Sequence, residues 1–491
     1  MNFDLCRGER CMHSNQQFDD KHLYRRLAGK IIKQINSGVL RTGERIPAVR
    51  KMSVQERVSI STVMQAYLTL ESRGYVEARP QSGYYVRFRR ESFLPEPKTS
   101  KPSGAVKKVA LNSLLAKGQA AMLDHSVIPF GAALPALELL PTAKLNRISA
   151  ALSRRAVRAV SSYNLPPGNL ELRRQLAKRS LDWGCALAPE DFVLTMGATE
   201  AMSLCLRAVT NPGETIAVES PTYFGILQLA ESLRLKVVEI PMNPRSGMCF
   251  DSLKILLRQH KIAACVGILN YNNPLGSLMP DENKCRLVRM LAEKEIPLVE
   301  NDVYGDLHFG EVRPHTAKSF DQSGLVLLCS SFSKTLAPGY RVGWTAPGKF
   351  KAEVEKLQLV STLSTPALPQ MTIAEFLQSG LYDRHLRQLR TAFAAQIERT
   401  AHAVAEYFPP NTKITRPQGG FVLWIELPKN VDSTKLQATA LAENISINPG
   451  ALFSASGKYR NFIRVSCGHP WSDKFDEAAN TLGRLIVHDV K

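Results

Sequence analysis

The sequence predicts an α/β protein with two domains, a small helical domain that ends in a two-stranded hairpin and a larger domain built on a mostly parallel sheet. Three features of the sequence lead to this prediction. Apolar residues recur at helical spacing before residue 90, a proline-rich stretch follows, and short apolar runs then alternate with helical segments. A length of 491 residues is also enough for more than one hydrophobic core.

Residues 18–90 are expected to form the small domain. Apolar spacing predicts a helix over 22–38, and turn residues separate it from two more helices, 48–57 and about 59–72. The runs YVEAR and YYVRF, joined by PQSG, then predict a hairpin. Three helices followed by a hairpin form a winged helix-turn-helix domain.

The small domain carries a large share of the positive charge. The formal net charge is +19, and residues 1–90 contain 17 Lys and Arg against 8 Asp and Glu. A basic domain on a less charged body indicates a nucleic-acid partner, with the start of the third helix in the major groove of double-stranded DNA. Gln65 would read an adenine edge. The expected DNA contacts are Arg50, Ser59, Ser61, Thr62, Gln65, Arg79, Gln81 and Ser82, and for each of them a solvated role is the alternative.

Residues 91–124 are expected to form a linker, because 91–108 are rich in proline, serine and lysine and offer little to bury. The larger domain spans 125–491 and closes with a smaller α+β segment. Its strand-like runs are DFVLTMG, TIAVES, KVVEIPM, ACVGILNY, IPLVEND and LVLLCSS. Ligands of such sheets bind at the carboxyl ends of the strands. The residues found just beyond these ends are Thr199, Tyr223, Asn273, Asp302 and Lys334.

Several protein classes are disfavoured. No apolar run approaches the roughly 18–20 residues of a membrane span, and the opening MNFDLCRGERCMH has charges where a signal peptide needs apolar residues. We therefore expect a cytoplasmic protein. Nine cysteines without a CxxC pair indicate reduced thiols. Cys6, Cys11 and His13 are more consistent with a mobile tail than with ligands, so no metal is expected.

The segment Cys329–Trp344, CSSFSKTLAPGYRVGW, places a lysine among hydroxyl side chains with an arginine seven residues later. A solvated loop is one interpretation. The other is a reactive amine beside an anion site formed by Ser331, Ser333 and Arg341. The run MGATEAMSLCLRAV supplies a Gly-Ala-Thr turn before a helix, where backbone amides can bind phosphate.

Three further strand-end residues suit a pyridine ring. The carboxylate of Asp302 can keep a ring nitrogen protonated, so that the ring withdraws electrons. Asn273 can hydrogen-bond a phenolic oxygen, and Tyr223 can stack on a flat ring. Each of these residues taken alone is commonly structural, so the prediction rests on their combination.

In chain order these motifs resemble the fold-type-I aminotransferases, which use pyridoxal 5′-phosphate (PLP). The matching pieces are Gly197-Ala198-Thr199, Tyr223, Asn273-Pro274-x-Gly276, Asp302-x-Tyr304 and Ser331-Phe332-Ser333-Lys334 with Arg341. The resemblance covers about 125–491. One departure is Leu275, where a threonine is common.

The resemblance implies a role for each residue. Lys334 would be the catalytic residue that binds PLP as a Schiff base, Asp302 would pair with the pyridine nitrogen, and Tyr223 would stack on the ring. Asn273 and Tyr304 would contact the ring hydroxyl. The residues implied at the phosphate are Ala198, Thr199, Ser331 and Arg341, with Ser333 in the same site. Tyr163, in SYNLPPG, would reach the phosphate of a neighbouring subunit, and Arg464, in NFIRVSCG, would bind an effector carboxylate.

The small domain resembles the GntR-type winged-helix domain in SGVLRTGERIPAVR, in TVMQAYLTLESRGYVEARP and in the glycine of the wing. Ile60 departs from the pattern, since many members have an arginine there. A GntR-type head joined to an aminotransferase-like body resembles the MocR-type subfamily of bacterial regulators. This implies a homodimeric, PLP-dependent transcriptional regulator that binds DNA at two half-sites and senses PLP or a small amino compound. The alternatives are an active aminotransferase with an accessory head and a body that serves only for dimerisation. Residual transamination stays open.

Overall fold

The structure is a computed structural model. It describes residues 23–36, 39–40, 43–72, 75–79, 82–86, 94–101, 103–109, 124 and 126–490. The chain divides into a small unit, 1–92, and a large unit, 93–491. Several residues named above lie outside the described residues, namely Gln81, Cys6, Cys11 and His13.

The small unit has the predicted winged helix-turn-helix elements. They are α1 (Leu23–Asn36), α2 (Val49–Glu56), α3 (Ile60–Ser72), β1 (Val76–Arg79) and β2 (Gly83–Val86). The two strands pair antiparallel as a hairpin. The apolar faces of α1 and α3 meet in a core that includes Ile31, Val63, Tyr67 and Leu70. The Tyr67 hydroxyl donates to the Pro47 carbonyl at 2.6 Å, which satisfies this buried polar group.

The large unit is built on a sheet in the order β3-β6-β5-β8-β9-β10-β11-β4, with β7 paired to β6. The central strands β6, β5, β8, β9 and β10 are parallel, as the alternating pattern predicted. The strands are β3 (Lys107–Lys108), β4 (Val193–Thr195), β5 (Thr215–Ser220), β6 (Lys236–Asn243), β7 (Gly247–Met248), β8 (Ile262–Gly267), β9 (Leu298–Asn301), β10 (Val326–Ser331) and β11 (Gly343–Ala346). Because parallel strands end at one edge, their final residues converge there.

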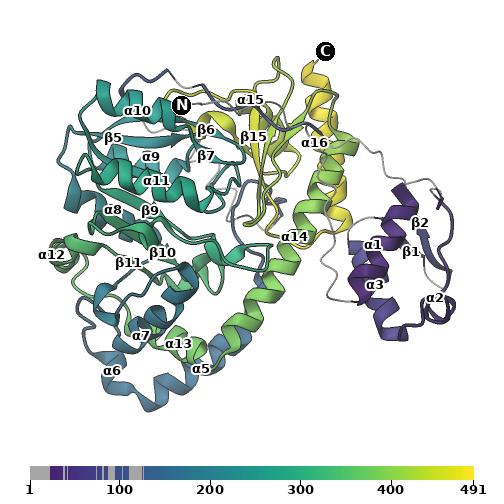
Figure 1. Cartoon of the computed structure of the whole chain (residues 1–491), viewed down its shortest axis with the longest axis horizontal. Helices are drawn as coiled ribbons and strands as arrows, with labels where there is room; N and C mark the ends of the chain where they lie inside the picture. The colour runs from purple at the N-terminus through teal and green to yellow at the C-terminus, as the bar shows by residue number, and fades with distance from the viewer. Residues whose placement is uncertain are drawn as a thin grey trace, which may run out of the picture. The chain divides into compact units, whose positions relative to one another are not determined.

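Helices flank this sheet (Figure 1). They include α5 (Thr142–Arg155), α6 (Val157–Ser161), α7 (Leu170–Ser180), α8 (Ala198–Val209), α9 (Phe224–Ser232), α10 (Phe250–Gln259), α11 (Asp281–Ala292), α12 (Lys351–Ser361) and α13 (Ala367–Gln378). The 27-residue helix α14 (Leu381–Tyr407) contacts α13 and leads to the closing α+β segment. That segment contains α15 (Ser433–Ala442), α16 (Asp473–Val490), β12 (Lys413–Ile414), β13 (Val422–Glu426), β14 (Asn448–Pro449) and β15 (Phe462–Ser466), with the sheet order β12-β13-β15-β14.

The expected linker differs from the structure in part, since its described residues 94–101 and 103–109 pack against the large unit. Strand β3 pairs antiparallel with the edge strand β6. Ser100 accepts from the Met242 amide at 2.8 Å, and Leu94 and Val106 pack against the cores. A proline-rich stretch has few amides to pair, yet it can lie along a sheet edge when its remaining groups find partners there. We call residues 94–109 the strap.

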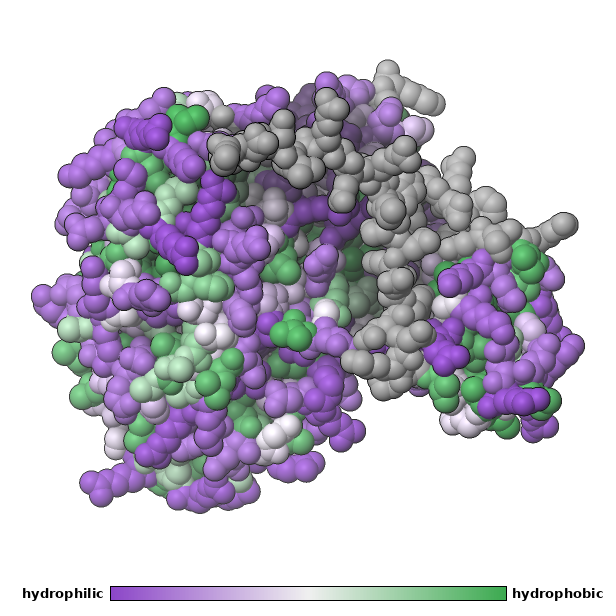
Figure 2. Space-filling model, viewed as in Figure 1, coloured by the Kyte–Doolittle hydropathy of each residue, from purple (hydrophilic) through white to green (hydrophobic). Residues whose placement is uncertain are grey.

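The surface has the polarity expected of a chain that buries its large side chains. The face in Figure 2 is mostly hydrophilic on the large unit, and apolar residues form small separate patches. No helix in the described ranges is long and apolar enough to cross a membrane.

The two units have separate cores, and this predicts independent unfolding. Leu70→Ala should destabilise the small unit by about 2–5 kcal/mol, because Leu70 is fully buried and its removal leaves a cavity. All four tryptophans, Trp183, Trp344, Trp424 and Trp471, lie in the large unit, so their fluorescence follows that unit alone. Denaturant titration should show an earlier far-UV transition and an unchanged fluorescence midpoint.

Leu68→Ala is the matched control, since Leu68 lies on the same helix but is 47% exposed. It should change neither signal by more than about 0.5 kcal/mol. A fluorescence midpoint that falls with Leu70→Ala would contradict independent units.

Candidate functional site

Lys334 lies just beyond the end of β10, in a short turn over Phe332–Lys334. The Ser331 side chain accepts from the Ser333 amide at 3.4 Å and starts this turn. The amine of Lys334 donates to the Ala133 carbonyl at 2.7 Å. Burial, together with the positive charges of Arg464 and Arg341, lowers the pKa of Lys334 to about 8. A larger fraction of this amine is therefore neutral near pH 7 than for an ordinary lysine, as a nucleophile requires.

An anion cradle adjoins this turn at the N-terminus of α8, which begins at Ala198. Arg341 donates to the Met196 carbonyl at 3.0 Å and reaches the Ser333 hydroxyl at 3.5 Å. Gly197 has φ +86°, and a Cβ there would lie 2.5 Å from the Arg341 guanidinium. Glycine is therefore required at this position. Thr199 is exposed on the first turn of α8, where free amides and the helix dipole favour an anion.

Asp302 follows β9 and is buried. Its Oδ1 accepts from the Asn270 amide at 2.8 Å, and its Oδ2 pairs with Arg313. Ser330 donates to the Asp302 backbone carbonyl at 2.8 Å. A Cβ at Gly305 would lie 2.6 Å from both Asp302 Oδ1 and the Arg313 guanidinium, so only glycine leaves room for this pair.

Arg313 is shared between two carboxylates, because its Nε also donates to Asp306 at 2.6 Å. Burial alone would raise the pKa of Asp306, but the charges of Arg313 and Arg179 lower this pKa far below its usual range. Asp302 thus has a buried cation as a fixed partner. Sequence reasoning missed Asn270, Ser330 and Arg313. The one sequence feature that indicates close packing around Asp302 is Gly305, three residues later. No local pattern indicated Arg313.

The side chains of Asn273 and Tyr304, both predicted to belong to the site, are in contact. Asn273 donates to the Tyr304 hydroxyl at 3.2 Å and accepts from Arg464 at 3.4 Å. Burial raises the pKa of Tyr304 to about 12, so the phenol stays protonated. Arg464 is 1% exposed, also bonds the Gly131 carbonyl, and leaves its Nε without a partner within the described residues.

Tyr223 immediately precedes α9, at the end of the loop that follows β5. A Cβ at Gly225 would overlap the Tyr223 ring, so this glycine fixes where the ring can lie. Burial raises the pKa of Tyr223, while Arg464 and Arg341 oppose that rise from nearby. The strand end is held by Glu219, which accepts from Ile268 N at 2.9 Å and from Asn272 at 2.7 Å. Glu219 therefore orders the loop that carries Asn273.

Tyr163 is not brought to the other site residues within one chain. Its side chain is 77% exposed. Exposed apolar side chains surround it in sequence, including Val157, Leu165 and Leu170. This face of the large unit therefore has unburied apolar surface.

The expected DNA contacts that the structure describes are exposed, except for Thr62 and Ser82, which are half-buried. Ser59 caps α3, accepting from the Thr62 amide at 3.1 Å, and its hydroxyl also bonds Ser61 and Thr62 at 2.8 Å each. Arg50 and Gln65 are exposed.

On the hairpin, the expected contacts have partners of their own. Arg79 pairs with Glu77 at 2.8 Å and lies 4.3 Å from the Tyr85 ring centroid. Ser82 bonds the Tyr85 hydroxyl at 2.6 Å. The hairpin side chains are therefore ordered before any partner binds.

Lys334, Arg341 and Arg464 form one cationic group, since the last two lower the pKa of the first. Within the described residues, their hydrogen-bond acceptors are neutral carbonyl, hydroxyl and amide oxygens. A fold with this site has the arrangement of a fold-type-I PLP-binding protein.

Comparison with known proteins agrees with this class. Residues 127–482 match the aminotransferase class I and II family, and residues 23–86 match the gntR family of bacterial regulatory proteins. The uncharacterized HTH-type transcriptional regulators YdcR and YjiR of Escherichia coli (strain K12) are 39% and 37% identical, each over 94% of this chain and 98% of the relative. LysN, the α-aminoadipate aminotransferase of Thermus thermophilus, has a TM-score of 0.70 at 27% identity, over 77% of this chain and 99% of LysN.

The chain belongs to the family that joins a GntR-type DNA-binding domain to an aminotransferase class I and II domain, consistent with the MocR-type subfamily. The prediction of these two domains is confirmed. Because relatives that match over 94% of this chain, and so over both domains, are transcriptional regulators, the regulator is favoured over the aminotransferase. PLP is the cofactor of the aminotransferase class. The cationic group, whose acceptors in the described chain are neutral, and the cradle at Gly197 fit this anionic cofactor.

The cradle predicts a strict need for glycine at position 197. Gly197→Ala should weaken PLP binding at least tenfold, because the added Cβ displaces Arg341 from the anion position. Gly213→Ala is the matched control, since Gly213 has a similar φ of +91° but nothing within 4 Å of the added Cβ. Both changes carry a similar backbone cost, so equal effects on the fluorescence-detected Kd would contradict the cradle.

The lowered pKa of Lys334 predicts the pH dependence of cofactor attachment. The ammonium loses its proton as pH rises through about 8, and only the free amine reacts. Borohydride-trapped attachment of PLP to Lys334, measured by mass spectrometry, should increase with pH and level off above a midpoint near 8. A midpoint in the ordinary range of lysine would contradict the effect of burial and of the neighbouring cations.

Proposed function

We propose that the protein is a homodimeric, cytoplasmic transcriptional regulator whose large unit senses PLP or a small amino compound and alters how two small units bind DNA. Its DNA target would contain two half-sites, one for each head. The observation that carries this proposal is the strap, which connects the chain of the DNA-binding unit to the loop that carries Tyr223. The alternative function, an active aminotransferase with an accessory DNA-binding head, is distinguished by the test below.

The residues of the site have distinct proposed roles. Lys334 would bind PLP covalently, Asp302 would face the ring nitrogen, and Tyr223 would stack on the ring. Asn273 and Tyr304 would hold the ring hydroxyl. The phosphate would be held by Ala198, Thr199, Ser331, Ser333 and Arg341. When bound, PLP supplies an aldehyde that combines with primary amines and a ring that withdraws electrons.

A dimer is supported by the position of Tyr163, which is exposed in one chain and flanked by exposed apolar residues. An interface over this face would bury that apolar surface and bring Tyr163 to the phosphate of the neighbouring subunit. Dimerisation would also place two heads on one body. The second head would then bind DNA intramolecularly, which raises affinity by roughly 10²–10⁴ when both half-sites can be reached.

The strap contacts the strand end that leads to the site. Ser100 donates to the Ser220 carbonyl at 2.5 Å and accepts from the Met242 amide at 2.8 Å, so it links β5 to β6. Ser220 lies three residues before Tyr223. Its hydroxyl also bonds Tyr459 at 2.8 Å. A shift of the Tyr223 loop would therefore displace Ser220 and alter its hydrogen bond with Ser100.

A second contact involves residues 131–133, which follow the strap in the chain. The Ala133 carbonyl accepts from Lys334, and the Gly131 carbonyl accepts from Arg464. A cofactor at Lys334 and a carboxylate at Arg464 would replace these carbonyls. Ligand binding would thus release the carbonyls of residues 131–133 from these cations and shift the Tyr223 loop, which Ser100 of the strap contacts through Ser220. A ligand regulates only if it favours one conformation over another, and these two exchanges provide such a difference.

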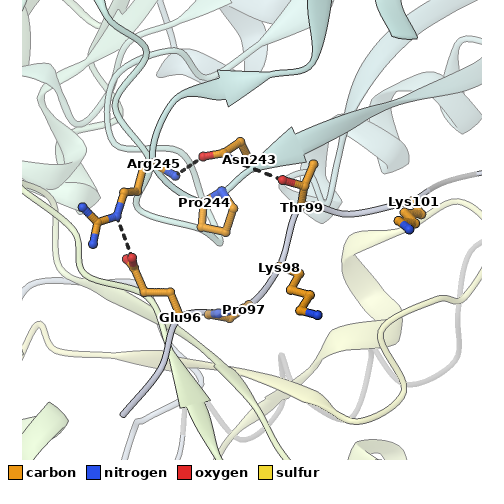
Figure 3. A pocket seen from close by; sticks show the side chains of 8 residues that line it. All are labelled: Glu96, Pro97, Lys98, Thr99, Lys101, Asn243, Pro244 and Arg245. Atoms are coloured by element: carbon orange, nitrogen blue, oxygen red, sulfur yellow. Dashed lines mark hydrogen bonds and ion pairs between the residues drawn. The ribbon is translucent and has the colours of Figure 1, made fainter. Parts of the chain in front are cut away.

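The strap is accessible along one side, as Figure 3 shows. Glu96 pairs with Arg245 at 2.6 Å, and Asn243 donates to Thr99 at 3.2 Å across an open pocket of about 520 Å³. These exposed contacts are worth little individually, about 0–1 kcal/mol for the ion pair. These side-chain contacts can therefore be exchanged at modest cost, whereas the pairing with β6 and the Ser100 hydrogen bonds hold the strap to the sheet.

The test measures DNA affinity in different ligand states. Duplexes selected by the full-length protein from a random library should contain two half-sites, and inserting about 5 base pairs between them should weaken binding because one half-site turns to the opposite face. PLP, or PLP with an amino acid from a panel, should shift affinity for the two-site DNA by about 5–150-fold. Equal affinity and identical footprints in the apo, PLP-loaded and amine-loaded states would reject regulation by the large unit and favour the aminotransferase.

Ser100→Ala tests the strap within the same experiment. It should reduce the ligand-dependent shift while leaving PLP absorbance unchanged, because it removes both side-chain hydrogen bonds without touching the cationic group. Ser103→Ala is the matched control, since Ser103 is exposed and, among the described residues, its side chain accepts only from the nearby Ala105 amide at 3.5 Å.

A further inference from the structure

An apolar stripe runs along the exposed face of α3. Ile60, Met64 and Leu68 are 53%, 37% and 47% exposed and recur every four residues, so they lie on one face. The opposite face, including Val63 and Leu70, fills the core of the small unit. Figure 2 shows apolar residues among hydrophilic ones on the small unit. The core of the small unit does not include this stripe, so its side chains are available to a partner.

The hydroxyl groups beside the stripe are already engaged. The Ser59 hydroxyl bonds those of Ser61 and Thr62 at 2.8 Å each, and Ser59 caps the helix as well. A hydroxyl used in this way has less capacity for a base edge than a free one. At the N-terminal end of α3, the exposed side chains without a bond of this kind are Ile60, Met64 and Gln65.

The surroundings of the stripe are basic. Arg50 and Lys51 are exposed on α2, and Arg57, at the C-terminal end of α2, is exposed as well. A narrow apolar stripe beside exposed cations does not suit a broad apolar protein interface. It suits a polyanion that has isolated apolar groups within a groove. Double-stranded DNA is such a partner, and the C5-methyl group of thymine is the apolar group that its major groove presents.

We propose that Ile60 and Met64 read thymine methyl groups in each half-site, an inference that rests on the proposed function. Side chains at i and i+4 are about 5–6 Å apart at Cβ. Successive bases on one strand rise by about 3.4 Å. The two methyl groups therefore belong to thymines within about two base steps of each other. The head then recognises a thymine-containing half-site through apolar contact at a position where a guanidinium would select guanine.

The test replaces thymine by deoxyuridine, which removes the methyl group and keeps every hydrogen-bonding atom. The probe is the two-site duplex selected from the random library, with each thymine of a half-site replaced in turn. Full-length protein should lose about fourfold in affinity for each methyl group that is read, from the free energy of burying one such group. Ile60→Ala and Met64→Ala should each abolish the response at one position.

Val54→Ala is the matched control, since Val54 is an exposed apolar residue on α2, outside the stripe. It should respond to deoxyuridine as the unchanged protein does. The comparison on the unchanged protein needs no substitution, so it is informative even if a variant fails to fold.

Three results would overturn the inference. They are selected half-sites without thymine, equal affinity for thymine and deoxyuridine duplexes, and loss of the dimer on substitution of Ile60, which would assign the stripe to a second copy. Failure of the proposed function is distinguishable, because the protein would then select no DNA sequence or would bind DNA identically in every ligand state.

Discussion

The large unit is organised around three like charges that meet at the end of a parallel sheet. Lys334, Arg341 and Arg464 come from different elements, and the described chain gives them neutral acceptors rather than carboxylates. Their mutual repulsion and burial lower the pKa of Lys334. This concentration of charge is stable only because backbone carbonyls and an amide satisfy it. Phosphate and carboxylate groups are anionic and therefore complementary to such a group of cations.

The carboxylates near the site, unlike the three cations, have partners of opposite charge. Asp302 and Asp306 share Arg313, so each of these buried carboxylates has a cationic partner. A buried carboxylate without such a partner tends to take up a proton, as Glu219 illustrates, since burial raises its pKa to about 8. Asp302 therefore has a cationic partner of its own, distinct from Lys334, Arg341 and Arg464. Gly305 makes this possible by leaving space for the pair.

The sequence predicted the elements of both units well, because they depend on local patterns. The run TIAVES became β5 with the expected bounds, and the recurrence of apolar residues gave α1 and α3. The strap was harder to predict. Its prolines and lysines are typical of a linker, and its pairing with β6 depends on an edge that only the folded sheet provides. Composition indicates how much apolar surface a segment can bury. Whether the segment packs against the domain depends on the neighbouring surface, here the edge of β6.

The sequence by itself determined the chemistry of the site: a lysine after β10, an aspartate after β9 and an arginine cradle beside a helix start. Lys334 and Asp302 each follow the end of a parallel strand, and parallel strands bring their ends together without further information. Arg341 lies in the turn between β10 and the antiparallel strand β11, which returns the chain to the same edge. Only the tertiary structure decided that Arg313 pairs with Asp302, that carbonyls of residues 131–133 reach Lys334 and Arg464, and that Ser100 lies against Ser220. These contacts join segments that are distant in sequence and lack a repeating pattern. Their partners are set by packing distance rather than by spacing along the chain.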